Sequence, residues 1–85
     1  MKLMAKKIIK AREYSFTVIY ELVKEGGYKA IVPLLPGLIT YGRDFEEARK
    51  MVKEAILCHI EALAKEGEEI PKESGLIQEK VAVKL

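Results

Sequence analysis

Residues 26–42 read GGYKAIVPLLPGLITYG, and this segment contains two short strand patterns separated by turns. Gly26 and Gly27 accept the positive φ angles of a two-residue hairpin turn, so a strand is expected on either side of the pair. Alternate residues of the strand that follows share one face, namely Tyr28, Ala30 and Val32. This alternation predicts a strand with one buried face.

Prolines and glycines bound the next strand of the segment. Pro33 limits how far the preceding strand can pair at the centre of a sheet. Pro36 and Gly37 fit the second and third positions of a type II turn. Residues 38–41 are then predicted to form a short third strand, which Gly42 ends.

The chain before the glycine pair alternates as well. Within residues 14–24, one side carries Phe16, Val18, Tyr20 and Leu22, and the other carries mostly Ser15, Thr17 and Glu21. The β-branched and aromatic residues of this segment favour a strand. The three strands are therefore predicted to form an antiparallel meander.

A helix is predicted to begin at Asp44, whose carboxylate can accept a hydrogen bond from a free amide of the first turn. Glu47, three residues later, can reach back in a capping box. Apolar residues then recur at intervals of three and four, at Phe45, Ala48, Val52, Ala55, Ile56, His59, Ile60 and Leu63. This stripe is expected to pack on one face of the sheet, and Gly67 is expected to stop the helix.

The end of the chain alternates again after a loop at residues 68–75. One face carries Ile77, Glu79, Val81, Val83 and Leu85, and the other carries Leu76, Gln78, Lys80, Ala82 and Lys84. This predicts a final strand at residues 76–85, which a right-handed crossover through the helix would place beside the first strand. Residues 1–13 are expected to be either a basic arm, a short helix or an extension of the first strand.

The expected fold class is α+β, with a single domain over residues 1–85. It is an antiparallel β-meander with one helix packed on one face and a final strand, in the order βββαβ. One helix cannot cover both faces of such a sheet, and exposed apolar edges are usually paired or covered. A homodimer or higher even oligomer is therefore expected, with contacts that involve Ile77, Val81 and Val83.

Composition narrows the function classes. The net charge of +2 is too small for the positive field that phosphate neutralisation needs. The one cysteine cannot form an intrachain disulfide, and no apolar run is long enough for a signal or a membrane span, so a cytoplasmic location is expected. The chain has no Asn, one Gln, one Asp and twelve Glu, a bias that suggests a thermophilic source.

Groups suited to catalysis are few. His59 is the single histidine, so one chain cannot build a two-histidine metal site, and His59 is expected to be a packing residue of the helix stripe. Cys58 lies between apolar neighbours and is expected to be a small buried hydrophobe. The glycines do not form a phosphate-binding loop. No enzyme activity, metal or cofactor is expected.

The segment quoted at the start resembles the signature of the HicB-like antitoxin family. The signature contains a Gly-Gly-Tyr strand, a Val-Pro-x-x-Pro-Gly turn, a Thr-x-Gly strand end and a Glu-Glu-Ala helix start. In this chain these positions are Gly26, Gly27, Tyr28, Pro33, Pro36, Gly37, Gly42, Glu46, Glu47 and Ala48. The resemblance covers about residues 16–71, and the chain departs from it with Leu38 where the family often has Cys, and with Phe45 where it often has Thr.

The resemblance implies a fold similar to a partial ribonuclease H fold, without the activity. A ribonuclease H site needs metal-binding carboxylates on the first strand, and the inward residues there are Phe16, Val18 and Tyr20. It further implies a protein that binds a small HicA-like toxin, which cleaves mRNA, and blocks its active surface. Binding to DNA is not expected, since no DNA-binding domain follows Leu85. The alternatives are an orphan oligomeric domain without a toxin partner, and then a nucleic-acid-binding role.

Overall fold

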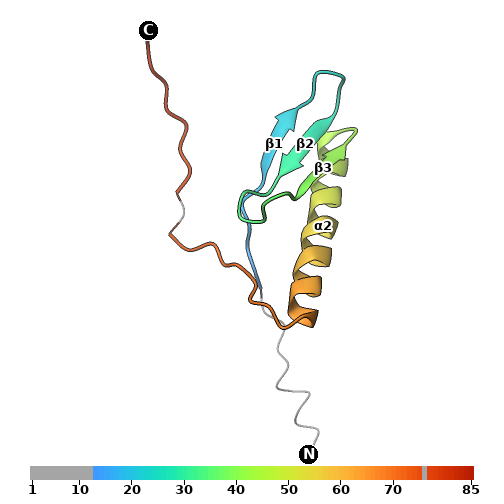
Figure 1. Cartoon of the computed structure of the whole chain (residues 1–85). Helices are drawn as coiled ribbons and strands as arrows, with labels where there is room; N and C mark the ends of the chain where they lie inside the picture. Colours follow the sequence, from blue (N-terminus) through green and yellow to red (C-terminus); the bar gives the residue numbers. More distant parts are fainter. Residues whose placement is uncertain (1–12, 76) are drawn as a thin grey trace, which may run out of the picture.

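Three short strands form an antiparallel sheet, and one long helix covers one face of it (Figure 1). The computed structural model describes residues 13–75 and 77–85. The strands are β1 (Ile19–Leu22), β2 (Tyr28–Ile31) and β3 (Ile39–Gly42), in the spatial order β1-β2-β3, and the helix is α2 (Phe45–Lys65). The predicted α+β class, a meander followed by one helix, is confirmed.

The strand register gives the sheet two chemically different faces. Tyr20 pairs with Ala30, and Ala30 with Thr40, on the face toward α2. On the opposite face Ile19 pairs with Ile31, and Ile31 with Ile39. Because side chains alternate along a strand, these three isoleucines form a row across the face that α2 does not cover.

The core lies between the sheet and the helix. Five residues are at most 2% exposed: Ala30, Val32, Leu35, Ala48 and Val52. Phe16, Val18 and Tyr20 pack against them, as the alternation before the glycine pair predicted. Leu22 does not pack against this core and is 73% exposed. It lies on the edge strand at the hairpin end, where the Phe45 ring contacts Tyr20 and Tyr28 instead.

The hairpin turn is longer than predicted. Leu22 pairs with Tyr28, so residues 23–27 form a five-residue loop, closed by hydrogen bonds from the Val23 amide to the Gly27 carbonyl (2.9 Å) and from the Gly26 amide to the Val23 carbonyl (2.8 Å). A two-residue turn at the glycine pair would place Val23 opposite Ala30 and turn Glu21 into the core. Burial of the correct strand face therefore overrides the local turn preference.

The second predicted turn is present. The Leu38 amide donates to the Leu35 carbonyl at 3.0 Å, and Gly37, at the third position, has a φ of +88°. These features match the type II turn expected for Pro36 and Gly37.

The apolar stripe of α2 faces the sheet as predicted, with Ala48 and Val52 fully buried. Cys58 was expected to be buried, and this was wrong, because the thiol side chain is exposed. Cys58 follows Val52 by six residues, a rotation of about 240° around the helix axis, which places it on the far side. The helix ends as predicted, with Gly67 at a φ of +72° and a bond from the Glu68 amide to the Leu63 carbonyl (2.9 Å).

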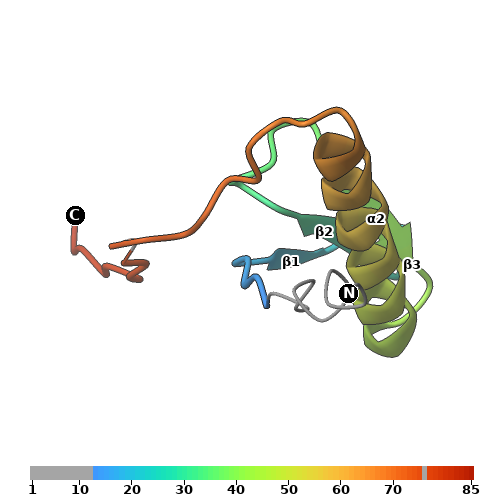
Figure 2. The same cartoon turned by 90° about the horizontal axis from the view of Figure 1, so that it is seen from below.

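The predicted final strand does not form in this chain. Residues 77–85 run away from the sheet and pair with none of its strands (Figures 1 and 2). A strand exists only through bonds to a neighbour, and this segment has no backbone partner among the described residues. The expectation for residues 1–13 lies, apart from Glu13, outside the described residues, as does the first position of the final strand, Leu76.

The loop after α2 returns to the start of the sheet before the chain departs. The Glu73 carboxylate accepts hydrogen bonds from the Thr17 amide (2.5 Å) and from the Thr17 hydroxyl (3.0 Å). In the part of the chain that the structure describes, no helix is both long and apolar enough to cross a membrane.

Candidate protein-interaction site

The signature residues meet where the hairpin loop, β3 and the first turn of α2 come together. A Cβ added to Gly42 would overlap the backbone of Ala48, so only glycine lets the helix lie this close to the strand. A Cβ added to Gly27 would strike the Gly42 carbonyl oxygen, and Gly27 also has a φ of +90°. Gly27, Gly42 and Ala48 therefore set the distance between the helix and the sheet.

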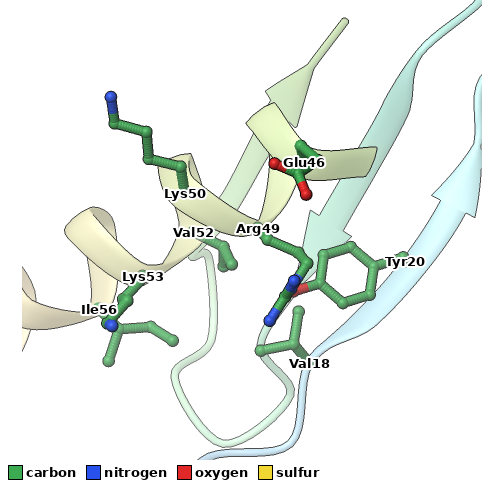
Figure 3. Close-up of a pocket in the computed structure, with 8 residues that line it drawn as sticks. All are labelled: Val18, Tyr20, Glu46, Arg49, Lys50, Val52, Lys53 and Ile56. Atoms are coloured by element: carbon green, nitrogen blue, oxygen red, sulfur yellow. The ribbon is translucent and has the colours of Figure 1, made fainter. Parts of the chain in front are cut away.

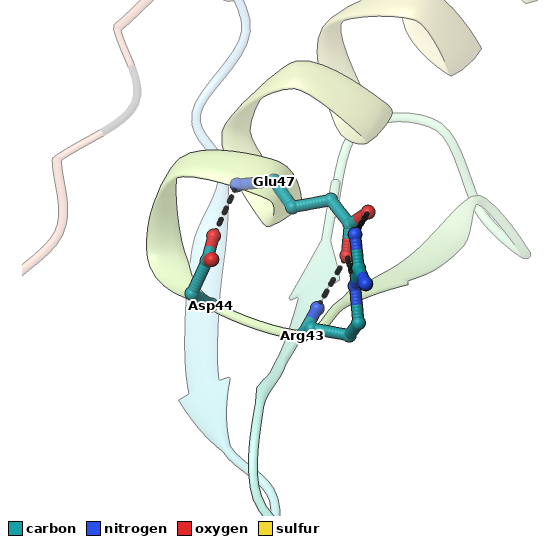
Figure 4. Close-up of polar contacts among 3 residues, drawn as sticks. All are labelled: Arg43, Asp44 and Glu47. Carbon is teal, nitrogen blue, oxygen red and sulfur yellow. Dashed lines mark hydrogen bonds and ion pairs between the residues drawn. The ribbon is translucent and has the colours of Figure 1, made fainter.

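The start of α2 is closed by its own side chains (Figure 4). The Asp44 carboxylate accepts from the Glu47 amide at 2.8 Å, as the capping box requires. Glu47 reaches back one residue further than predicted, and its carboxylate accepts from the Arg43 amide (2.6 Å) and from the Arg43 guanidinium (3.1 Å). The guanidinium contact lowers the pKa of Glu47 and raises the pKa of Arg43.

The other signature residues shape the backbone and the packing. Tyr28 stacks edge-on against Phe45, with ring centroids 5.7 Å apart. Pro33 and Pro36 are exposed and lie in the two turns around the buried Leu35. Gly26 and Gly37 have open space around them and take positive φ angles. These positions do not converge on a shared polar pocket.

A groove runs between α2 and the outer edge of β1 (Figure 3). Its volume is about 490 Å³, and its floor is apolar, formed by Val18, Tyr20, Val52 and Ile56. Arg49 reaches from the helix toward Val18 and Tyr20, whereas Lys50 points away from the strand (Figure 3). The groove therefore combines an apolar floor with a charged rim of three basic residues, Arg49, Lys50 and Lys53, and one acidic residue, Glu46.

The groove continues along the helix toward its C-terminal half. The second hollow, of about 310 Å³, is again mostly apolar and shares Lys53 and Ile56 with the first. Its other apolar lining residues include Phe16, Leu57 and Ile60. Together the two hollows, called here the β1 groove, follow the free edge of the sheet.

The uncovered face of the sheet is the second candidate surface. It carries the row Ile19, Ile31 and Ile39, and the neighbouring row contains Tyr41 and an ion pair between Lys29 and Glu21 (3.2 Å). Ile39 is 46% exposed and Tyr41 is 62% exposed. An apolar patch on a small domain is typical of a protein-binding surface.

Side chains suited to catalysis are not gathered at either surface. His59 is partly buried on the helix stripe, and Cys58 is exposed on the far side of α2. Among residues 13–75 and 77–85, no three His, Cys, Asp or Glu side chains are placed to hold a metal ion.

The residues of the β1 groove were not predicted as a site. Val18, Tyr20 and Ile56 were expected in the core between sheet and helix, with a final strand beside the first strand. Because residues 77–85 leave the sheet, this part of the core becomes an open groove. The signal available in the sequence was Lys53, a basic residue directly beside the apolar stripe.

The sheet, helix α2 and the two apolar surfaces define a small α+β domain. The family described as the HicB-like antitoxin of bacterial toxin-antitoxin system matches residues 16–83 of this chain. The chain therefore belongs to the HicB-like antitoxin family, as the resemblance of residues 26–48 indicated. The match extends past residue 71, where the resemblance was expected to end, and includes most of the segment that leaves the sheet.

Three relatives support this membership. The chain is 40% identical over 65 residues to a UPF0150 protein of Synechocystis sp., covering 76% of this chain and 82% of the relative. It is 42% identical over 59 residues to a UPF0150 protein of Thermoplasma acidophilum, covering 69% and 86%. It is also 36% identical over 63 residues to an uncharacterized 14.9 kDa protein of Haemophilus phage HP1, covering 74% of this chain and 47% of that protein.

Proposed function

We propose that this protein is an antitoxin that binds a small HicA-like, mRNA-cleaving toxin and blocks its active surface. The observation that carries the proposal is the family match over residues 16–83, which spans both the folded domain and the segment that leaves it. The proposed location is the cytoplasm, where such a toxin meets its mRNA.

The uncovered sheet face is the proposed toxin-binding surface. Ile39 and Tyr41 project from the edge strand β3 and remain substantially exposed. Ile19 and Ile31 continue the apolar surface inward across the sheet. Burial of an exposed isoleucine contributes roughly 1.5–3 kcal/mol, so a partner that covers this row gains appreciable affinity.

Co-expression with the product of the adjacent gene, followed by co-purification, tests this function. A tagged wild-type chain is expected to retain the neighbouring protein, and Ile39→Glu is expected to lose it. Leu22→Glu is the matched control, because Leu22 is a similarly exposed apolar residue, at 73%, on the side of the sheet that faces α2. Equal retention by both variants would exclude the uncovered face, and no retention by the wild type would contradict the toxin partner.

A second candidate function is that of an orphan oligomeric interaction domain. The exposed segment at residues 77–85 favours it, since self-association through that segment needs no toxin. The neighbouring reading frame discriminates between the two functions, because a HicA-like toxin would be a short basic protein with a single His. A chain without such a neighbour would be the orphan form.

We also propose that the protein is a homodimer or higher even oligomer, binds no cofactor and has no ribonuclease activity. DNA binding is proposed to be weak, salt-sensitive and independent of sequence at most. Cleavage of RNA with magnesium or manganese that is abolished in Glu47 or Glu54 variants would overturn the non-enzymatic assignment. A tight complex with a specific operator would overturn the proposal that DNA binding is weak and independent of sequence.

A further inference from the structure

Residues 77–85 form an amphipathic segment that pairs with no strand of the described sheet. Residues 77–85, called here the C-terminal arm, are extended, and the side chains of one face are largely free: Ile77 is 88% exposed, Val81 69% and Val83 88%. The opposite face of the arm carries Gln78, Lys80, Ala82 and Lys84. Since the family match runs to residue 83, most of the arm lies within the part of the chain that the family matches.

The β1 groove has the complementary chemistry. β1 lies at the edge of the sheet, so one side of its backbone has no strand partner within the described residues. A strand added there would direct alternate side chains onto the groove floor. The floor residues Val18, Tyr20 and Ile56 are apolar, as are four of the five residues on the matching face of the arm.

Charge adds a second match. The fifth residue on the apolar face of the arm is Glu79, an acidic side chain that would be costly to bury without a partner. The rim of the β1 groove offers the cations Arg49 and Lys53 at the side of α2, beside one carboxylate, Glu46, in the first turn of the helix. The opposite face of the arm is polar enough to remain in water beside Glu21.

The root of the arm directs it outward. Glu73 is held at Thr17 by two hydrogen bonds, and Gly75, two residues later, has a φ of +71°. From there the arm extends away from its own sheet, as both views of the molecule show (Figures 1 and 2). Nine extended residues span about 30 Å, which is enough to reach a neighbouring molecule.

We infer that the C-terminal arm of one chain pairs with the outer edge of β1 in a second copy, with its apolar face in the β1 groove, and that the second copy does the same in return. Within residues 13–75 and 77–85, each chain carries both an unpaired arm and an unfilled groove, so the exchange is reciprocal and closes as a twofold-symmetric dimer. It completes in trans the fourth strand that the sequence predicts. The inference rests on the dimer proposed above and is independent of the toxin.

A charge swap between arm and groove tests the exchange on the full-length chain without any toxin present. Lys53→Glu places two carboxylates at each interface of a homodimer, and Glu79→Lys places two ammonium groups there. Each variant alone is expected to dimerise at least tenfold more weakly than wild type. In an equimolar mixture both interfaces pair Glu with Lys, so a heterodimer is expected, and the double variant in one chain is expected to recover wild-type dimerisation.

The measurement is native mass spectrometry with one variant labelled with nitrogen-15, supported by sedimentation equilibrium. Lys65→Glu is the matched control for the groove, since it makes the same change in charge on an exposed side chain of α2 that lines neither hollow of the β1 groove. Both altered side chains are exposed, so circular dichroism should show an unchanged fold. A monomeric wild type would overturn the exchange, as would single variants that dimerise as well as wild type, or a mixture that forms no heterodimer. None of these results would contradict toxin binding.

Discussion

Replacement of Gly42 by alanine tests the close contact between β3 and α2. The added methyl group would overlap the backbone nitrogen and Cα of Ala48 and lie 2.8 Å from the carbonyl carbon of Glu47. These are backbone atoms, which cannot rotate away as a flexible side chain can. The strand and the first turn of the helix would have to separate, and the core around Ala48 would open with them.

The expected loss follows from this geometry. Overpacking of a core costs about 1–3 kcal/mol, and a clash with two elements of backbone belongs at the upper end, at about 3 kcal/mol. For a domain of this size each kcal/mol shifts the melting midpoint by about 4–8 °C. Gly42→Ala is therefore expected to melt about 12–24 °C below wild type.

Gly26→Ala is the control for this measurement. Gly26 has a φ of +106°, but no atom lies within 4 Å of an added Cβ. Its substitution costs only the backbone strain, about 1–2 kcal/mol. Thermal unfolding followed by circular dichroism, at one protein concentration for all chains, compares the two. If Gly42→Ala melts within a few degrees of wild type, or above Gly26→Ala, the close-contact account of the signature glycine is refuted.

Four further outcomes are expected. Asp44→Ala removes the cap of α2 and should lower the free energy of unfolding by about 1 kcal/mol in denaturant titrations. The pKa of Glu47 is lowered in the fold, so its ionised carboxylate contributes stability above the ordinary carboxyl pKa, and this contribution is lost as pH falls through the lowered pKa. Wild type should therefore lose more stability than Glu47→Gln below about pH 4.3. Val83→Lys should shift sedimentation toward smaller species, and Ala82→Lys, on the polar face of the arm, should not. The scarcity of Asn and Gln predicts a melting midpoint above the mesophile range of about 45–65 °C.

Local chemistry that acts between near neighbours was readable from the sequence. The Asp44 cap, the type II turn at Pro36 and the helix stop at Gly67 all depend on side chains or φ angles within a few residues. The alternation before the glycine pair also gave the correct inward face, with Phe16 and Tyr20 against the helix. Each of these elements is determined by a pattern that one segment contains.

Features that depend on distant contacts were not predictable in the same way. The glycine pair favours a two-residue turn, but the core requires the register in which Leu22 meets Tyr28. The apolar neighbours of Cys58 suggested burial, although its angle around the helix decides its exposure. The hydrogen bond between Thr17 and Glu73 joins residues 56 positions apart, and no local sequence pattern predicts it.

The final segment shows the limit most clearly. Its alternation identifies a strand-forming sequence, but it does not say which strand edge supplies the partner. Among the described residues, the segment pairs with no strand edge of its own sheet, and the groove beside β1 is open. The candidate site is therefore a consequence of topology, although the apolar residues of its floor, Val18, Tyr20, Val52 and Ile56, were visible as part of the core pattern.

The most direct test of the antitoxin function is a titration of the neighbouring gene product's RNA cleavage with this protein. The purified toxin is mixed with a fixed amount of mRNA and increasing amounts of the full chain, and intact RNA is quantified on gels. Cleavage is expected to fall in proportion to the added protein and to stop at stoichiometric equivalence. Undiminished cleavage in the presence of a large excess of folded wild-type protein would contradict the function.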